Sequence, residues 1–442
     1  MPILELKIRK HCHEIKTEGF PCLLRKIRKT ISLLMTTILA LPIIGIIILL
    51  KPFKIRIGEL RCERIGHYAY ETDRYLCQRD VGMHDGYFDI FFYANSICNC
   101  QLQKMIETNL RVLRIPKSSL LMRRVVKLLR WLPKGSEHVI SVSGNRVTDP
   151  KWSLARSKVH FFFSNEEEEF GRKTLQKIGI PHGAQYVCIY GRDSVYLDKS
   201  FPERDWAYHG YRDDNISTYL PAAEALIQRG YYVVRMGHIV KEPLQTTNPG
   251  IIDYVTKGYR TDFLDMYLPA HCRFFLGNPS GLIAIPAIFR RPMALVNFSQ
   301  GNGFYNWDIN TDNAISIWKR VWVHKEQRFL TFREMTDLFL PGNYRRKDLS
   351  KIADLGGLEI IDNTADEIKD VALEMDDRIN GAWKMSEENA FLQEKFKKIY
   401  YEIQDDVKFT SVGEKFLRDN SDLLNAHPLT HTRIGQKLES IV

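Results

Sequence analysis

Three short polar segments in the middle of the chain each follow an apolar run of strand length. They are residues 190–194 (YGRDS), 235–238 (RMGH) and 277–281 (GNPSG). If the runs are parallel strands, the segments lie beyond their carboxyl ends, where α/β proteins bind ligands. An arginine there can hold a diphosphate with fixed charge. A serine and a glycine before an apolar helix can cap it and let a ligand approach exposed amides.

The sequence therefore predicts an anion-binding site built from several strand ends. Taken singly, each feature also has an ordinary structural explanation. Ser280 and Gly281 can belong to a routine capped helix, and either arginine can form a surface ion pair. All three at strand ends together favour a ligand site. The residues expected to contact a phosphate-bearing ligand are Arg192, Arg235, Gly237, Asn278, Ser280 and Gly281.

No metal or cofactor motif accompanies these segments. The chain has no Walker A loop, GxGxxG, HExxH or Asp-x-Asp sequence. We therefore expect no metal and no bound cofactor, with arginines and helix-end amides stabilising a leaving diphosphate.

A reaction that transfers a group to a hydroxyl needs a base to take its proton. His67, in the Gly66-His67 turn after the first predicted strand, is one candidate, and a structural histidine is the alternative reading. Asp193 is a second catalytic candidate, and Asp85 and Asp89 are rivals.

The elements that must position these residues alternate between strand and helix. Strands are predicted at 55–65, 87–93, 139–142, 159–163, 186–190, 231–235, 273–276, 293–296 and 358–361, with helices between them. Such alternation predicts parallel sheets in α/β layers. We expect two Rossmann-like doubly wound domains at 55–182 and 183–375. Helices in 376–442 are expected to pack back across the domains.

Residues 1–54 form a basic terminus and a membrane segment. Residues 30–50 contain no charge and are long enough for a helix to cover the ~30 Å hydrocarbon layer. Lysines and arginines flank both ends, although positive charge normally marks one side of a membrane. A single span and a re-entrant or interfacial hairpin that bends near Pro42 and Gly45 both fit, and these mid-run residues slightly favour the hairpin.

The net charge of +10 is concentrated in two places. Residues 1–64 and 101–134 each carry a net charge of +8, and the rest sums to −6. In 119–134, Arg123, Lys127 and Arg130 share one helical face and apolar residues, including Trp131, fill the remaining arc. Such a helix fits an anionic membrane surface or packs on its own domain. Nucleic-acid binding is not expected, because no aromatic stacking platform accompanies the charge.

The segments YVCIYGRDSVYL, YRDDNISTYLPAAEALIQRG and FFLGNPSGLIAIP resemble a family of bacterial glycosyltransferases of surface-polysaccharide synthesis. More distantly, they are similar to fucosyltransferase-like GT-B enzymes. The resemblance implies a nucleotide-sugar donor, with Arg192 as the diphosphate clamp and Ser280 and Gly281 as a second donor contact. One departure is that a single Arg192 replaces the His and doubled arginine of fucosyltransferases, so GDP-fucose is not implied. Gly66-His67 resembles the Gly-His turn of some GT-B amino-terminal domains.

We therefore expect a membrane-associated, metal-independent glycosyltransferase that uses a nucleotide sugar and a glycan or lipid-linked acceptor. The expected location is the inner membrane, with the active domain on the cytoplasmic face, because eight cysteines form no CxxC pair and several lie in apolar runs. A non-catalytic scaffold of a polysaccharide-assembly complex and a sugar-nucleotide epimerase on the same fold are the alternatives.

Overall fold

The computed structural model describes residues 17, 19–114, 119–140, 158–203, 205–298, 313–339, 357–401 and 410–425. They form two compact units that are not continuous along the chain. Unit 1 comprises Met1–Glu63, His84–Ile97 and Leu110–Gly144, and unit 2 comprises Arg64–Met83, Cys98–Asn109 and Asn145–Val442. The protein is mixed α/β with parallel sheets, as the strand and helix alternation predicts. The domain boundaries given above remain predictions.

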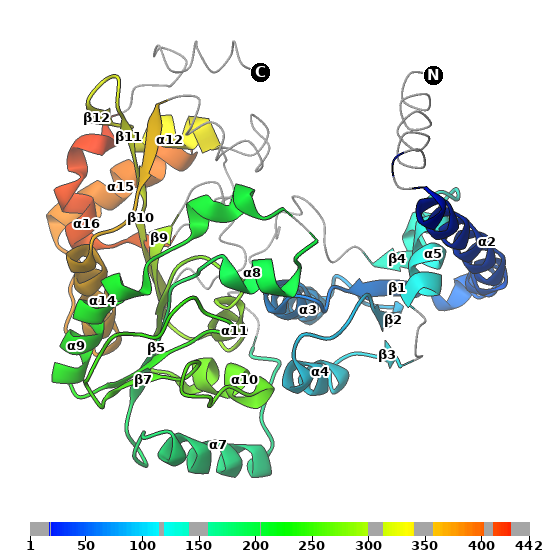
Figure 1. Cartoon of the computed structure of the whole chain (residues 1–442), viewed down its shortest axis with the longest axis horizontal. Helices are drawn as coiled ribbons and strands as arrows, with labels where there is room; N and C mark the ends of the chain where they lie inside the picture. Colours follow the sequence, from blue (N-terminus) through cyan, green and yellow to red (C-terminus); the bar gives the residue numbers. More distant parts are fainter. Residues whose placement is uncertain are drawn as a thin grey trace. The chain divides into compact units, whose positions relative to one another are not determined.

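Unit 1 contains a four-stranded parallel sheet in the order β3-β2-β1-β4 (Figure 1). Its strands are β1 (Ile55–Leu60), β2 (Phe88–Tyr93), β3 (Val112–Leu113) and β4 (Val139–Ile140). Its helices are α2 (Phe20–Leu49), η1 (Lys51–Phe53), α5 (Ser119–Leu129) and η2 (Gly135–His138). The helices after β1 and β2, α3 (Ile65–Asp80) and α4 (Cys100–Glu107), belong to unit 2.

The apolar segment is one continuous helix. α2 runs for 30 residues through Pro42 and Gly45. The prediction of a hairpin that turns within residues 30–50 is therefore wrong, because the helix continues through Pro42 without reversing direction. By length and composition this helix could cross a membrane, and it is the one described helix that meets both criteria.

The basic helix α5 packs on its own unit along part of its apolar arc. Met122, Val125, Val126 and Leu129 are buried, whereas Trp131 just beyond the helix is exposed. The apolar face therefore contributes to the core of unit 1.

Unit 2 is built on a seven-stranded sheet in which every pair of neighbours is parallel. The order β7-β6-β5-β8-β9-β10-β14 corresponds to 3-2-1-4-5-6-7 along the chain, the order of doubly wound nucleotide-binding sheets with one added strand. The strands are β5 (Tyr186–Tyr190), β6 (Tyr232–Arg235), β7 (Ile251–Asp253), β8 (Phe275–Gly277), β9 (Met293–Phe298), β10 (Ala314–Trp318) and β14 (Ser411–Val412).

A separate antiparallel sheet has the order β12-β11-β13, formed by β11 (Arg320–Val323), β12 (Arg328–Phe329) and β13 (Leu358–Ile361). Residues 159–163, predicted as a strand, are irregular. The acidic run that follows them does begin a helix, with a capping box between Ser164 and Glu167.

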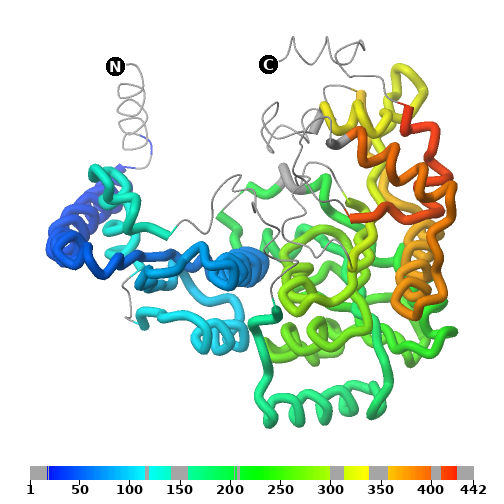
Figure 2. Tube along the Cα trace, turned by 180° about the vertical axis from the view of Figure 1, so that it is seen from behind, coloured from blue at the N-terminus to red at the C-terminus, as the bar shows by residue number. Residues whose placement is uncertain are grey.

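The remaining helices of unit 2 pack on the large sheet or on other helices. α9 and α14 lie side by side although about 140 residues separate them (Figures 1 and 2), and Arg229 just after α9 forms an ion pair with Asp376 of α14 at 2.6 Å. Besides α3 and α4, the described helices of unit 2 are α7 (Asn165–Lys177), α8 (Val195–Ser200), η3 (Ala207–Arg212), η4 (Ile216–Tyr219), α9 (Leu220–Gln228), α10 (Asp262–His271), α11 (Ala284–Ile288), α12 (Phe332–Phe339), α14 (Ala365–Ile379), α15 (Glu387–Tyr401), α16 (Glu414–Asp419) and η9 (Ser421–Leu424).

The buried carboxyl of Asp265 in α10 predicts a pH-dependent stability. Burial raises its pKa to about 6, against the opposing charge of Arg260. Because the folded state holds the proton more tightly than the unfolded chain does, this stabilisation is complete below about pH 4 and is lost as the pH rises through 6. The Asp265→Asn variant should lack this dependence, which is on the order of 2–3 kcal/mol between about pH 4 and pH 7.

Denaturant unfolding at several pH values measures this effect, with the exposed Asp198→Asn as a matched charge change. An Asp265→Asn protein whose stability still falls over this range as steeply as that of the parent would contradict the assignment.

Candidate functional site

The candidate site lies at the switch point of the large sheet. The strand order reverses between β5 and β8, which are the first and fourth strands along the unit 2 sheet. In open parallel sheets, ligands bind beyond the carboxyl ends of the strands at this position. The segments after β5 and β8 are the two that contain Arg192 and Ser280. The predicted convergence of these two segments is confirmed.

The two loops are held together by hydrogen bonds through Asn278. The backbone N–H of Arg192 donates to Oδ1 of Asn278 at 3.2 Å, and the N–H of Asn278 donates to the carbonyl of Tyr190 at 3.3 Å. The Asn278 side-chain amide donates to the carbonyl of Arg212 at 2.9 Å. Asn278 is buried, so the structure gives it the role of fixing the loop at the switch point.

Arg192 presents a buried guanidinium at this edge of the sheet. Its Nη1 donates to Oδ1 of Asp213, and its carbonyl accepts from the N–H of Asp214 at 2.8 Å. Burial raises the pKa of the Asp213 carboxyl, and the charge of Arg192 opposes that rise. Burial also raises the pKa of the neighbouring Tyr190 hydroxyl to about 12, so Tyr190 stays protonated at neutral pH.

Ser280 does not cap a helix, in contrast to the sequence prediction. The short helix α11 begins at Ala284 after Ile283, and Oγ of Ser280 accepts from the N–H of Leu282 at 3.3 Å in the preceding turn. Pro286 explains this start, because proline is favoured in the first turn of a helix. The five-residue helix offers no anion site at its amino end, so Ser280 and Gly281 remain as loop contacts only.

His67 lies next to this loop within unit 2. It stands in the first turn of α3, where a Cβ on Gly66 would lie 2.6 Å from Cα of Gly281. Gly66 therefore leaves no space for a side chain and lets the two backbones meet. The structure thus brings the backbone next to His67 against the loop that carries Ser280.

The hydrogen bonds of His67 define its tautomer. A guanidinium nitrogen of Arg64 lies 2.8 Å from Nε2, and Oε1 of Glu71 lies 2.9 Å from Nδ1. Because a guanidinium only donates, Nε2 accepts from Arg64 and Nδ1–H donates to Glu71. The imidazole is thereby presented with a lone pair on Nε2 and a carboxylate behind it, the arrangement of a general base and its orienting group.

Three other predicted residues have structural roles. Arg235 is buried with its Nη1 3.1 Å from Oδ2 of Asp253 on β7. A Cβ on Gly237 would lie 2.9 Å from Cγ1 of Val240, so Gly237 permits close packing. Asp193 accepts backbone N–H groups from Val195 and Lys241 with its two carboxylate oxygens. We therefore do not include these three in the proposed site. The rival Asp89 lies in unit 1, in a bidentate ion pair with Arg56.

Lys319 is a site residue that the sequence reading missed. It follows β10, is buried, and lies with Nζ 3.0 Å from the carbonyl oxygen of Asp213 and 2.6 Å from Oδ1 of Asp362. Arg192 and Lys319 thus place two cations around Asp213. The signal in the sequence is similar to that of Arg192, a basic residue that follows the largely apolar run AISIW, but residues 314–318 are not among the predicted strands.

Asn297, on β9 at the same edge, adopts a left-handed backbone with φ 50°. Its backbone N–H donates to Oδ1 of Asn363 at 2.6 Å, and the Asn363 N–H donates back to Oδ1 of Asn297 at 2.6 Å. Such a conformation in a non-glycine residue costs on the order of 1 kcal/mol, which this reciprocal pair offsets. The two residues fix the chain at the strand end beside the switch point.

A second polar cluster joins α3 to the segment after α11. Asp73, Cys77 and His160 have the composition and proximity of a metal-binding group. Arg290, however, donates two hydrogen bonds to Asp73, and His160 has Asp73 at one ring nitrogen and Asp80 at the other. The guanidinium neutralises the carboxylate that would ligate a cation, so the cluster fits a buried ion-pair network.

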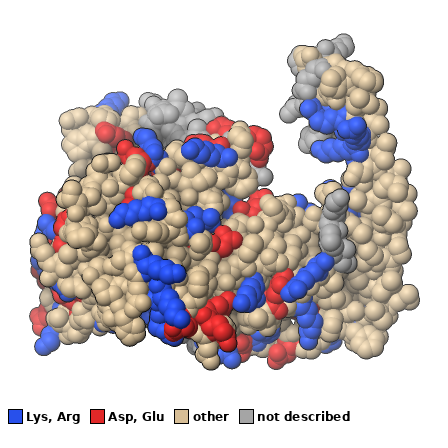
Figure 3. All heavy atoms as spheres, turned by 60° about the horizontal axis from the view of Figure 1, so that its bottom comes forward, with Lys and Arg blue, Asp and Glu red and all other residues tan. Residues whose placement is uncertain are grey.

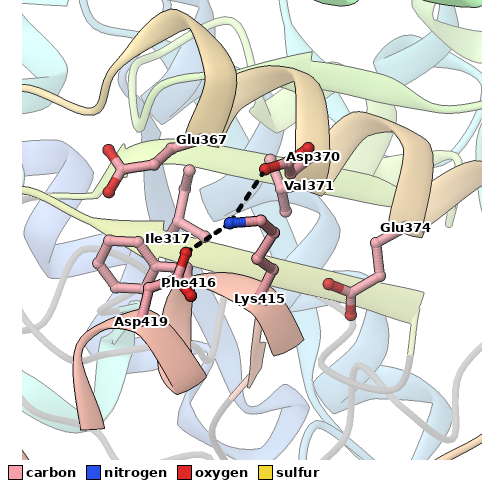
Figure 4. A pocket seen from close by; sticks show the side chains of 9 residues that line it. Ile317, Glu367, Asp370, Val371, Glu374, Lys415, Phe416 and Asp419 are labelled. Carbon is pink, nitrogen blue, oxygen red and sulfur yellow. Dashed lines mark hydrogen bonds and ion pairs between the residues drawn. The ribbon is translucent and has the colours of Figure 1, made fainter.

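A shallow hollow lies between α14, α16 and β10, away from the switch point. Figure 4 shows Lys415 between Asp370 and Asp419, and the Lys415–Asp419 ion pair is 2.6 Å long. The other two carboxylates of its lining are also paired, Glu367 with Arg320 and Glu374 with Arg378. With its charges balanced in this way, the hollow does not fit an anionic ligand.

No family model and no curated protein sequence matches the chain. Among solved structures, it is similar to the ADP-heptose lps heptosyltransferase II of E. coli, with 13% identity over 60% of this chain and 90% of that chain and a TM-score of 0.37. It is also similar to a glycosyl transferase family 9 protein from Veillonella parvula DSM 2008, with 12% identity over 69% and 97% and a TM-score of 0.36. The wall teichoic acid polymerase TagF matches with 10% identity over 88% and 90% and a TM-score of 0.28. Because all of these TM-scores lie below 0.5, we base the functional proposal on the chain's own residues.

Proposed function

We propose that the protein is a glycosyltransferase that acts at a membrane surface, taking a sugar from a nucleotide-sugar donor and passing it to a glycan or lipid-linked acceptor. The observation that supports this proposal best is the meeting, at the switch point of a doubly wound sheet, of Arg192, the 277–281 loop and the helix start that bears His67.

In this mechanism Arg192 and Lys319 stabilise the diphosphate that leaves with the nucleotide. Both side chains lie at the carboxyl ends of the strands and share Asp213 as a partner. Fixed cations in a shielded site stabilise developing negative charge without reorganising, so catalysis needs no metal in this proposal. The loop at Ser280 and Gly281 supplies the further donor contact that the sequence resemblance implies.

His67 would take the proton from the acceptor hydroxyl as that oxygen attacks the anomeric carbon. Its Nε2 lone pair is the accepting atom, and the Nδ1–H bond to Glu71 stabilises the imidazolium that forms. The incoming hydroxyl replaces Arg64 as the hydrogen-bond partner of Nε2.

A thermal-shift panel of nucleoside-diphosphate sugars tests the proposal directly. We expect at least one of them to raise the melting temperature of the full chain, since a ligand that binds only the folded state stabilises it. Arg192→Ala should weaken binding of that donor about 10–100-fold, because a charge-assisted hydrogen bond contributes about 1.5–3 kcal/mol.

Arg172→Ala, a change of the same type at an exposed position on α7, is the matched control and should bind the donor normally. A panel in which no nucleotide sugar shifts the melting temperature would overturn the proposal and favour the scaffold alternative. Turnover of the donor in the absence of any acceptor to a new sugar nucleotide would instead favour the epimerase.

A further inference from the structure

The carboxyl-terminal part of α2 belongs to the core of unit 1. Ala40, Ile44 and Ile47, spaced four and three residues apart, line one helical face. They pack in one cluster with α5 and the sheet, formed with Ile57, Phe92, Met122, Val125, Val126 and Leu129. This part of the helix cannot leave unit 1 without uncovering that cluster.

From residue 30 onward, most of the helix surface outside this face is apolar and exposed. No residue of 30–39 is buried, and on the packed part Leu41, Ile46 and Leu49 are 59%, 56% and 81% exposed. Trp131, just beyond α5 in the same unit, is 80% exposed. An exposed apolar surface of this kind marks a site of contact with a membrane or another protein.

Charge complementarity identifies the partner. No acidic residue occurs in residues 19–58, whereas basic residues stand before and after the apolar run: Arg25, Lys26, Arg28, Lys29, Lys51, Lys54 and Arg56. Figure 3 shows Lys and Arg side chains gathered beside a broad uncharged surface around α2. Juxtamembrane lysines and arginines attract anionic lipids, each by about 1 kcal/mol.

A spanning orientation conflicts with this packing. Crossing the hydrocarbon takes about 20 apolar residues, but the uncharged stretch that is not packed on unit 1, residues 30–39, covers only ~15 Å, half of the ~30 Å layer. Moving residues 40–50 into the hydrocarbon would carry Arg123, Arg124 and Lys127 of α5 with them. Each buried charge costs about 2.5–3.5 kcal/mol in a bilayer.

We propose that α2 lies in the plane of an anionic bilayer and anchors unit 1 to the membrane surface without crossing the bilayer. The exposed face of α2 and Trp131 enter the interfacial layer, and both basic ends contact the headgroups of one leaflet. This orientation accounts for positive charge on both sides of an apolar run. It rests on the membrane association proposed above and is independent of sugar transfer.

Flotation of the full chain with lipid vesicles tests this binding to the membrane surface. We expect binding to vesicles that contain phosphatidylglycerol and weaker binding to vesicles of phosphatidylcholine alone. When the purified protein is added to preformed anionic vesicles, an epitope tag at the amino terminus should remain accessible to external protease, on the same side as unit 1.

A protected tag would show that the helix crosses the bilayer, and would overturn the in-plane orientation while leaving membrane association intact. Failure to float with anionic vesicles would overturn both, whereas a donor still bound in solution would leave the sugar-transfer proposal standing.

Substitutions at two exposed positions of α2 test whether this helix forms the membrane-binding surface. Leu41→Glu combined with Leu49→Glu should reduce the vesicle partition coefficient at least about tenfold, because both positions enter the interfacial layer. Phe391→Glu, which replaces a 60% exposed residue of α15 in unit 2, is the matched control and should leave partition unchanged. Equal vesicle binding by the double variant and the parent would overturn the proposal that α2 forms the membrane-binding surface.

Discussion

The His67→Ala protein is expected to transfer sugar about 10²–10⁴-fold more slowly than the parent while binding the nucleotide-sugar donor with similar affinity. This is the contribution that a positioned general base typically makes to a rate. His67 is suited to that role because Arg64 and Glu71 set its tautomer and the 277–281 loop lies directly beside its helix. Donor affinity should change little, because the proposed diphosphate contacts are Arg192 and Lys319.

The measurement is the rate of product formation at saturating donor, using the nucleotide sugar found by thermal shift. Glu71→Gln should give an intermediate loss, since it keeps a hydrogen-bond acceptor behind Nδ1 but removes the charge that stabilises the imidazolium. His182→Ala, at an exposed position remote from α3 in sequence, controls for loss of a histidine. A His67→Ala protein that retains full transfer activity would remove this residue from the mechanism.

The Asp73→Asn protein is expected to lose about 3–5 kcal/mol of unfolding free energy, a large part of the stability of a typical domain. Asp73 is 1% exposed and accepts hydrogen bonds from both Arg290 and His160. Removing the carboxylate charge leaves the Arg290 guanidinium, which is largely buried, without its counter-charge. Breaking one partner of such a pair costs far more than the pair itself contributes.

Denaturant unfolding of the full chain measures this loss, and Asp419→Asn on the exposed side of α16 is the matched control. The double variant Asp73→Asn with Arg290→Met should lose less than the sum of the two single changes, because the second change removes the uncompensated charge. Strict additivity would show that the two side chains do not act as a pair. Transfer activity should fall as well, since Asp73 holds the helix that carries His67.

Local patterns in the sequence predicted four of the seven strands of the large sheet, β5, β6, β8 and β9, and the place of Arg192 after β5. The run Tyr186–Tyr190 is a buried strand with the predicted bounds, and the polar segments after β5 and β8 meet as parallel strand ends must. Arg235 is the last residue of β6, but its partner Asp253 belongs to a three-residue strand that is too short to carry a periodic signal. Whether an arginine at a strand end faces a ligand or a neighbouring strand depends on that distant partner.

The residues that the sequence did not reveal act through contacts between distant segments. Lys319 becomes part of the site only because β10 lies next to β9 and brings it to Asp213, a separation of 106 residues. The network of Asp73, His160 and Arg290 draws on three segments, none of which carries a motif. Ser280 was misassigned as a cap because the proline in the next turn moved the helix start to Ala284.

The interleaving of the two units along the chain has a consequence for the order of folding during synthesis. Asp73 leaves the ribosome 217 residues before its partner Arg290, and at about 5–20 residues per second the wait is on the order of 10–40 s. Throughout that interval the unit 2 segment that contains Arg290 has not been synthesised. The residues of α3 that this segment later covers therefore remain exposed to water in the nascent chain. The first strands of the protein can pair early, but the helix between them meets its partner Arg290 only after 217 further residues have been synthesised.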